Sequence, residues 1–168
     1  MKNTLLIISL LLSLPTFSGE HALGAHEHGS IKLGLAVEKN IVELDIDGPA
    51  ESFIGFEYLP RTEKEKKVFN NAKNLWEKNF FQLVSFDKKL NCKVAEASFT
   101  QVLEGTESSG HSDIEAKAKI SCMAPVAGTE VQVSLKKYFK NIKKLSAEIL
   151  STNTKSVEIT KLVQVLKL

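Results

Sequence analysis

Hydrophobic and polar residues alternate along residues 31–47, and this pattern predicts two antiparallel strands joined by a tight turn. The turn falls at Lys39-Asn40, and Gly48-Pro49 ends the second strand, because proline has no amide hydrogen to donate to a ladder. Charged or small residues occupy the alternate positions, so one face of this hairpin is expected to be buried. The apolar positions are Ile31, Leu33, Leu35, Val37, Val42, Leu44 and Ile46.

The pattern changes to helical spacing after Pro60 and predicts a helix from Glu63 to about Phe80. Thr62 and Glu65 have the spacing of a capping box, which satisfies the unpaired amides of a first helical turn. One stripe of the helix is apolar and includes Trp76, which we expect in the core rather than in a binding platform. The stripe consists of Val68, Phe69, Ala72, Leu75 and Trp76.

The rest of the chain is rich in further strand patterns. Residues 53–56 predict a buried corner leading into the long helix, through Phe53, Ile54 and Phe56. Strands are expected over residues 92–102, 112–123, 131–135, 145–150 and 157–168. The fold class that follows is α+β: a single domain with a mostly antiparallel sheet, one long capped helix packed on it and one short helix or turn.

That short helix or turn falls in the lysine-rich run "KKYFKNIKKL", residues 136–145. Such a run suggests either a membrane-surface patch or a solvated basic face. The apolar residues Tyr138, Phe139 and Ile142 give too little apolar surface for a membrane patch. We therefore favour a solvated face.

The first residues have the features of a secretory signal. Lys2 precedes an apolar run from Leu5 to Leu14, which is shorter than the roughly 20 residues that span a bilayer. Thr16 and Ser18 are small residues at the positions that a signal peptidase requires. We expect residues 1–18 to be removed after Ser18, residues 19–30 to form an N-terminal arm and residues 31–168 to form the domain of an exported protein.

Composition excludes several classes of function. Lysine and arginine total 22 against 20 aspartate and glutamate residues, so no strongly basic surface points to nucleic acid. The mature chain contains no further apolar run of membrane-spanning length. No HExxH, GxSxG or glycine-rich phosphate loop occurs, and we expect a protein that is not an enzyme. A hydrolase using a histidine–carboxylate site is the minor alternative.

Two cysteines, Cys92 and Cys122, are the whole cysteine content. An even count in an oxidising compartment favours a disulfide, and the spacing excludes a CxxC redox pair. Closing this loop contributes roughly 3.5 kcal/mol in the chain-entropy model. Metal ligation by the pair is the alternative.

Three of the four histidines lie within residues 21–28. In an extended segment His26 and His28 point to the same side, about 7 Å apart, so that both imidazoles reach one ion. A closed site needs more ligands, and the best candidates are His111 and Asp113, which repeat the same spacing. The alternative is a solvated tail with a surface histidine, and His21 is expected to be a bystander.

Four stretches in fixed order resemble the ZrgA-like family of zinc-regulated periplasmic proteins. They are "GAHEHGSIKLGLAVE", "LDIDGPAESFIGFEY" followed by the capped helix, "CKVAEASF", and "HSDIEAKAKISC" after a polar insert. The resemblance covers essentially the whole mature chain. It matches His26 and His28 to the family's opening histidine pair, His111 and Asp113 to the end of the insert, and the two cysteines to the family's pair.

The resemblance implies a periplasmic protein of zinc homeostasis in Gram-negative bacteria, which binds Zn²⁺ and assists a zinc ABC importer through that importer's periplasmic zinc-binding protein. Two departures stand out. The insert "EGTESSGHS" keeps a single histidine where the family carries a histidine-rich tract, and Tyr58 stands where the family often has histidine. We therefore expect at most one ion, bound by His26, His28, His111 and Asp113. The alternative is a metal-independent adaptor that keeps the fold and has lost most zinc ligands.

Overall fold

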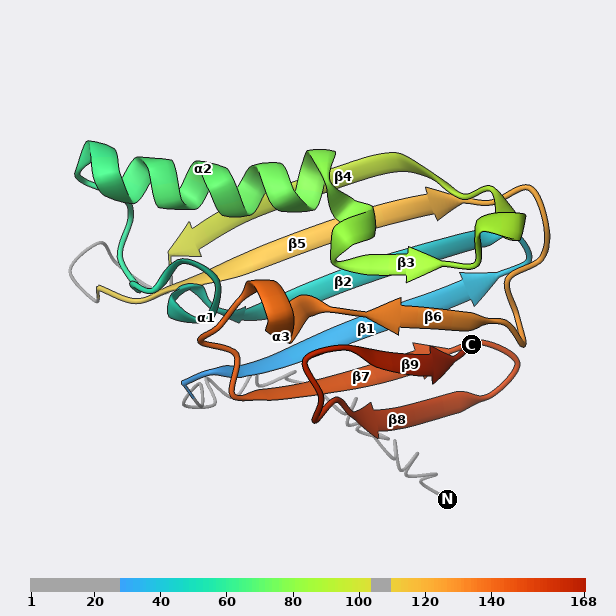
Figure 1. The fold of residues 1–168 in the computed structure, drawn as a ribbon. Helices are drawn as coiled ribbons and strands as arrows, with labels where there is room; N and C mark the ends of the chain where they lie inside the picture. Colours follow the sequence, from blue (N-terminus) through green and yellow to red (C-terminus); the bar gives the residue numbers. More distant parts are fainter. Residues whose placement is uncertain (1–27, 104–109) are drawn as a thin grey trace, which may run out of the picture.

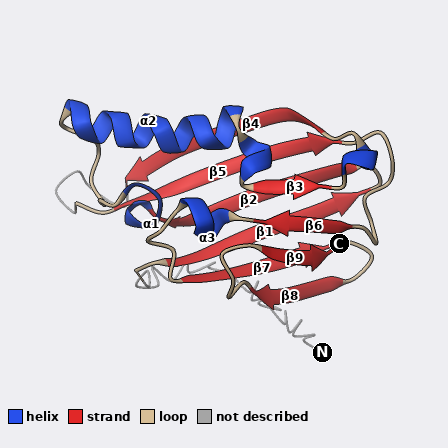
Figure 2. Ribbon diagram, viewed as in Figure 1, coloured by secondary structure: helices blue, strands red, loops and turns tan. Residues whose placement is uncertain are grey.

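The computed structural model describes residues 28–103 and 110–168. Along the chain, strands and short helices alternate around one long helix, α2 (Figures 1 and 2). The elements are β1 (Ser30–Glu38), β2 (Ile41–Pro49), α1 (Ala50–Ile54), α2 (Glu63–Lys78), a 3₁₀ turn (Phe80–Gln82), β3 (Val84–Phe86), a second 3₁₀ turn (Lys88–Leu90), β4 (Lys93–Leu103), β5 (Ser112–Ser121), β6 (Glu130–Val133), α3 (Leu135–Tyr138), β7 (Lys144–Leu150), β8 (Thr154–Glu158) and β9 (Gln164–Lys167).

The strands form two sheets. The larger has the order β4-β5-β2-β1-β7-β8, and the smaller has the order β3-β6-β9. Every pairing is antiparallel except that of β1 with β7, which is parallel. The predicted fold class, a sheet-rich α+β domain with one long helix, is confirmed. The single strand expected over residues 157–168 is wrong, because β8 and β9 belong to different sheets.

The core lies between the larger sheet and the elements that cover one of its faces. Figure 1 shows α2 running along β4 and β5, with the smaller sheet in front of β1 and β7. Trp76 of α2 is fully buried, and its Nε1 donates a hydrogen bond to the carbonyl oxygen of Lys117 at 2.9 Å. Its ring meets Phe80 edge to face. The prediction that Trp76 is a core residue is confirmed.

The predicted hairpin and capped helix are both present. Leu35 pairs with Leu44 across β1 and β2, and the side chains at the apolar positions of these strands are buried, apart from Val37, which is partly buried. Thr62 accepts a hydrogen bond from the Glu65 amide, and the Glu65 side chain accepts one from the Thr62 amide, which completes the capping box. Burial of one face and capping of the helix start therefore follow from local sequence.

Cys92 and Cys122 form the predicted disulfide. The bond joins the residue just before β4 to the residue just after β5, at the same end of this antiparallel pair. No free cysteine is present in the part of the chain that the structure describes. The alternative of metal ligation by the two thiols is excluded in this oxidised state.

Two local predictions are refined. The predicted corner at residues 53–56 is the end of a short helix, α1, and the turn that follows it, and its Phe53 and Ile54 are buried. The lysine-rich run contains the short helix α3, which begins at Leu135, so Leu135 belongs to a helix and not to the preceding strand. Among the described residues, no helix combines the length and the apolar character needed to cross a membrane.

Candidate metal centre

Four side chains with metal-ligating groups meet at one end of the larger sheet. His28 lies just before β1, Glu51 in the first turn of α1, Glu57 in the loop between α1 and α2, and His111 just before β5. Figure 1 shows the start of β1, α1 and the start of β5 at the same end of this sheet, on the left of the view. Segments far apart in the sequence therefore supply one cluster.

Glu57 is the centre of this cluster. Its Oε1 lies 2.8 Å from Nδ1 of His28, and its Oε2 lies 2.5 Å from Nδ1 of His111. The His28 nitrogen is also 3.0 Å from Oε1 of Glu51. Both imidazoles are 58% exposed, whereas the Glu57 side chain is only 19% exposed. The Glu57 side chain is thus partly buried, and the two histidine side chains beside it are exposed to solvent.

His28, Glu51 and Glu57 fit the donor set of a divalent metal ion. One ligand atom from each lies within 4.8 Å of the other two. Zinc bound to imidazole and carboxylate at 2.0–2.2 Å spaces tetrahedral ligands about 3.3 Å apart. The measured separations of 2.8 and 3.0 Å from His28 to the two carboxylates are slightly shorter. These two separations are within a few tenths of an ångström of the tetrahedral spacing, and the two carboxylates would balance the charge of a divalent ion.

The backbone around the centre needs two glycines. Gly55 ends α1 with φ of 85°, a left-handed conformation that turns the chain and separates Glu51 from Glu57. Gly29 follows His28 with φ of 81°, and a Cβ there would lie 3.0 Å from the carbonyl oxygen of Asn141. The Asn141 side chain donates to the carbonyl oxygen of Glu51 at 2.9 Å. Asn141 therefore lies against both the segment of His28 and the helix that carries Glu51.

Tyr58 is fixed to the start of α2. Its hydroxyl donates to Oε1 of Glu65 at 2.9 Å, while the other Glu65 oxygen accepts the backbone amides of Arg61 and Thr62. The amide hydrogen bonds from Thr62 and Arg61, followed by the Tyr58 hydroxyl, lower the pKa of Glu65 to about 2. The same hydrogen bond raises the pKa of Tyr58. Tyr58 therefore acts as an anchor of the loop, with its hydroxyl already engaged.

The predicted ligands can now be placed. His28 and His111 both contact Glu57, and their roles as metal ligands stay predictions. His26 lies outside the described residues, as does His21, so the roles predicted for both stay predictions. Asp113 stands in β5 opposite Pro49 and Val102, and alternation directs it to the sheet face opposite that of Ser112. Its part in metal binding also stays a prediction.

The ligands predicted from sequence did not include Glu51 or Glu57, which the structure places beside His28. Both lie in the stretch "PAESFIGFEY", which carried the family resemblance. The sequence does contain an indication that the two carboxylates lie close together, since Glu51 and Glu57 flank a glycine at which the chain turns. Only the fold shows that this turn faces the segment before β1.

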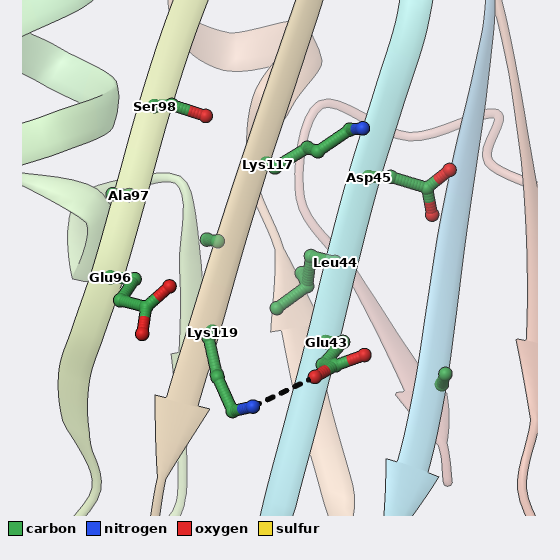
Figure 3. Close-up of a pocket in the computed structure, with 10 residues that line it drawn as sticks. Glu43, Leu44, Asp45, Glu96, Ala97, Ser98, Lys117 and Lys119 are labelled. Carbon is green, nitrogen blue, oxygen red and sulfur yellow. Dashed lines mark ion pairs between the residues drawn. The ribbon is translucent and has the colours of Figure 1, made fainter.

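A second feature, on the outer face of the larger sheet, has different chemistry. It is a shallow depression of about 610 Å³ crossed by β2 and β5. Figure 3 shows Lys119 directed at Glu43, and the two ions are 3.1 Å apart. This hydrogen bond, together with the charge of Glu43, raises the pKa of Lys119. No histidine or cysteine occurs among the described residues that line it, so it is a charged, solvated surface.

Comparison with known families decides the identity of the chain. The family model described as "ZrgA family zinc uptake protein" matches residues 25–168. The chain belongs to the ZrgA family of zinc uptake proteins. The match includes all four residues of the cluster, and the predicted family is confirmed. No curated protein matches the chain. A role in zinc uptake follows from the family, and the histidine–glutamate cluster offers a place for the metal.

Proposed function

We propose that this ZrgA family protein is an exported, non-enzymatic zinc-binding accessory of uptake, which binds Zn²⁺ as cargo in the periplasm. The observation that carries the proposal is Glu57, whose two oxygens lie beside Nδ1 atoms of two different histidines. Imidazole and carboxylate form a donor set that suits zinc. Glu51 adds a second carboxylate beside His28, so the cluster offers an ion both kinds of donor.

The ligands divide into two groups in this proposal. His28, Glu51 and Glu57 bind the ion directly, since their ligand atoms lie close enough together to share it. His111 contacts the second oxygen of Glu57 and orients that carboxylate, as outer partners of metal ligands commonly do. Three protein ligands leave the fourth tetrahedral position open.

The open position and the exposed imidazoles suit a site that passes its metal on. A buried, four-ligand site would hold zinc as a structural element. Here His28 and His111 are each more than half exposed, so another protein's ligand can reach the ion. We propose the periplasmic zinc-binding protein of a zinc ABC importer as the receiver, and the zinc uptake role of the family supports this choice.

Calorimetric titration of the mature protein with Zn²⁺ tests metal binding. We expect one site in the wild type and a much weaker one in the double variant His26→Ala/His28→Ala, with His21→Ala as a control that leaves binding intact. The melting temperature should rise with zinc, because an ion that binds only the folded state stabilises it by about 2.7 kcal/mol at 100 times its Kd. A wild type that binds no zinc would leave the metal-independent adaptor as the function.

Recovery of partners from a periplasmic extract tests the accessory role. The tagged protein should recover the zinc-binding protein of the importer when zinc is present, and recover less of it after a chelator is added. Equal recovery with and without chelator would contradict a metal-dependent transfer and favour the adaptor.

A further inference from the structure

Two side chains of the larger sheet donate hydrogen bonds to the main chain of the loop that carries Glu57. Ser112 is 2% exposed, and its hydroxyl donates a hydrogen bond to the carbonyl oxygen of Glu57. Nε2 of Gln101 donates to the carbonyl oxygen of Tyr58 at 3.0 Å and to Oγ of Ser112 at 2.7 Å. Two consecutive carbonyls of the loop are thus fixed by one connected pair.

The pair belongs to a rigid part of the fold. Gln101 lies in β4 and Ser112 begins β5, and these strands pair in register from Lys93 to Leu103 with a single irregularity. The disulfide closes the far end of the same two strands. A group on two paired strands that a disulfide also joins moves less than one on a loop, so it can define the position of the segment that it binds.

Gln101 is an unfavourable choice for stability alone. Its Oε1 is buried and has no hydrogen-bond partner among the described residues. A buried acceptor without a partner is destabilising, and an apolar side chain of similar size would avoid it. What the amide contributes instead is its Nε2 group, which reaches the Tyr58 carbonyl and Ser112 together.

We propose that Ser112 and Gln101 are positioning residues of the metal centre. They fix the main chain at Glu57 and Tyr58, so that the Glu57 carboxylate presents one oxygen to His28 and the other to His111. The proposal rests on the zinc-binding function proposed above. Removal of outer partners of metal ligands weakens metal binding by roughly 10–100-fold, and a loss of this size is expected from either residue.

Because Tyr58 also anchors the loop, the effect of Ser112 and Gln101 on metal affinity can be separated from their effect on global stability. The Tyr58 hydroxyl ties the loop to α2 through Glu65, independently of the sheet. Without Ser112 or Gln101 the loop therefore stays attached at one end, and the protein stays folded. What it loses is the fixed direction of Glu57, which changes metal affinity more than global stability.

The test compares Ser112→Ala and Gln101→Met with two controls. Thr100→Val changes an exposed position of β4 next to Gln101, and Trp76→Phe weakens the core far along α2. Zinc affinity is measured by competition with a chromophoric chelator. Amide hydrogen exchange over residues 55–59 is measured on the metal-free protein, and the melting temperature is recorded for each variant.

The expected result is a 10–100-fold loss of zinc affinity and faster exchange over residues 55–59 in both Ser112→Ala and Gln101→Met. Thr100→Val should change neither, and Trp76→Phe should lower the melting temperature without changing affinity. Unchanged exchange in the loop, or affinity losses that only follow melting temperature across all four variants, overturns the positioning role. A wild type that binds no zinc overturns the proposed function, while the loop exchange still decides whether the pair anchors Glu57.

Discussion

The Nδ1 atom of His28 lies 2.8 Å from Oε1 of Glu57. This contact joins the segment before the first strand to the loop that precedes the long helix. The same carboxylate meets His111 through its other oxygen. One side chain therefore connects three segments that are distant in sequence. If the cluster binds zinc, Glu57 is the residue on which binding depends most.

Replacing Glu57 by glutamine is expected to weaken zinc binding by about 100-fold or more, beyond the loss typical of outer partners. The amide keeps the shape of the side chain but removes its charge and one acceptor oxygen. Glu115→Gln is the matched control, since Glu115 is exposed on the outer face of β5. Chelator competition gives both affinities. Equal binding by the two variants would place the metal elsewhere.

His28 and His111 are expected to contribute unequally. His28 lies beside both Glu51 and Glu57, whereas the contact of His111 in this cluster is with one oxygen of Glu57. His28→Ala should abolish most zinc binding, and His111→Ala should weaken it by roughly 10–100-fold. Titration calorimetry of the two single variants measures this difference. A larger loss from His111→Ala would mean that His111 is itself a main ligand.

Glu65 should give the stability of the protein a dependence on acid pH. Its pKa is about 2 in the folded protein, below the ordinary value of 4.5, so the folded state favours the charged form. The stability that results is fully present above about pH 4.5 and is lost as the pH falls towards 2. Wild type should therefore exceed Glu65→Gln in stability at pH 7, with the difference shrinking across this window.

Urea denaturation at pH 7, 4.5 and 3 measures this difference. Glu63→Gln serves as the control, because the Glu63 carboxylate is 89% exposed and pairs with Lys66 on the helix surface. A Glu65 effect that stayed constant from pH 7 to pH 3 would show that the capping box acts through shape and not through charge.

Trp76→Phe is expected to lower the free energy of unfolding by about 2 kcal/mol, from lost packing and a lost hydrogen bond. The indole is fully buried and donates to the carbonyl oxygen of Lys117 across the sheet. Zinc affinity should not change, because the residue lies away from the cluster. Chemical denaturation and zinc titration of the same sample check both statements.

The sequence by itself determined the local elements. Alternating apolar residues gave the first hairpin, and Thr62 with Glu65 marked the start of α2. The two cysteines pointed to a disulfide by their number and compartment. Each of these features depends on neighbouring residues or on a pairing without alternatives, which is why sequence was sufficient. Sequence also singled out His28 and His111, because histidine chemistry is specific, and both lie beside Glu57 in the structure.

Tertiary structure alone decided how distant segments meet. The parallel pairing of β1 with β7 and the separation of β8 from β9 into different sheets follow from packing across the whole core. Glu51 and Glu57 became ligand candidates only once α1 faced the start of β1. Periodicity reports which face of a segment is buried, but not which other segment covers it. Which segment covers a face depends on the combined burial of many side chains, and this packing brought the residues of the candidate metal centre together.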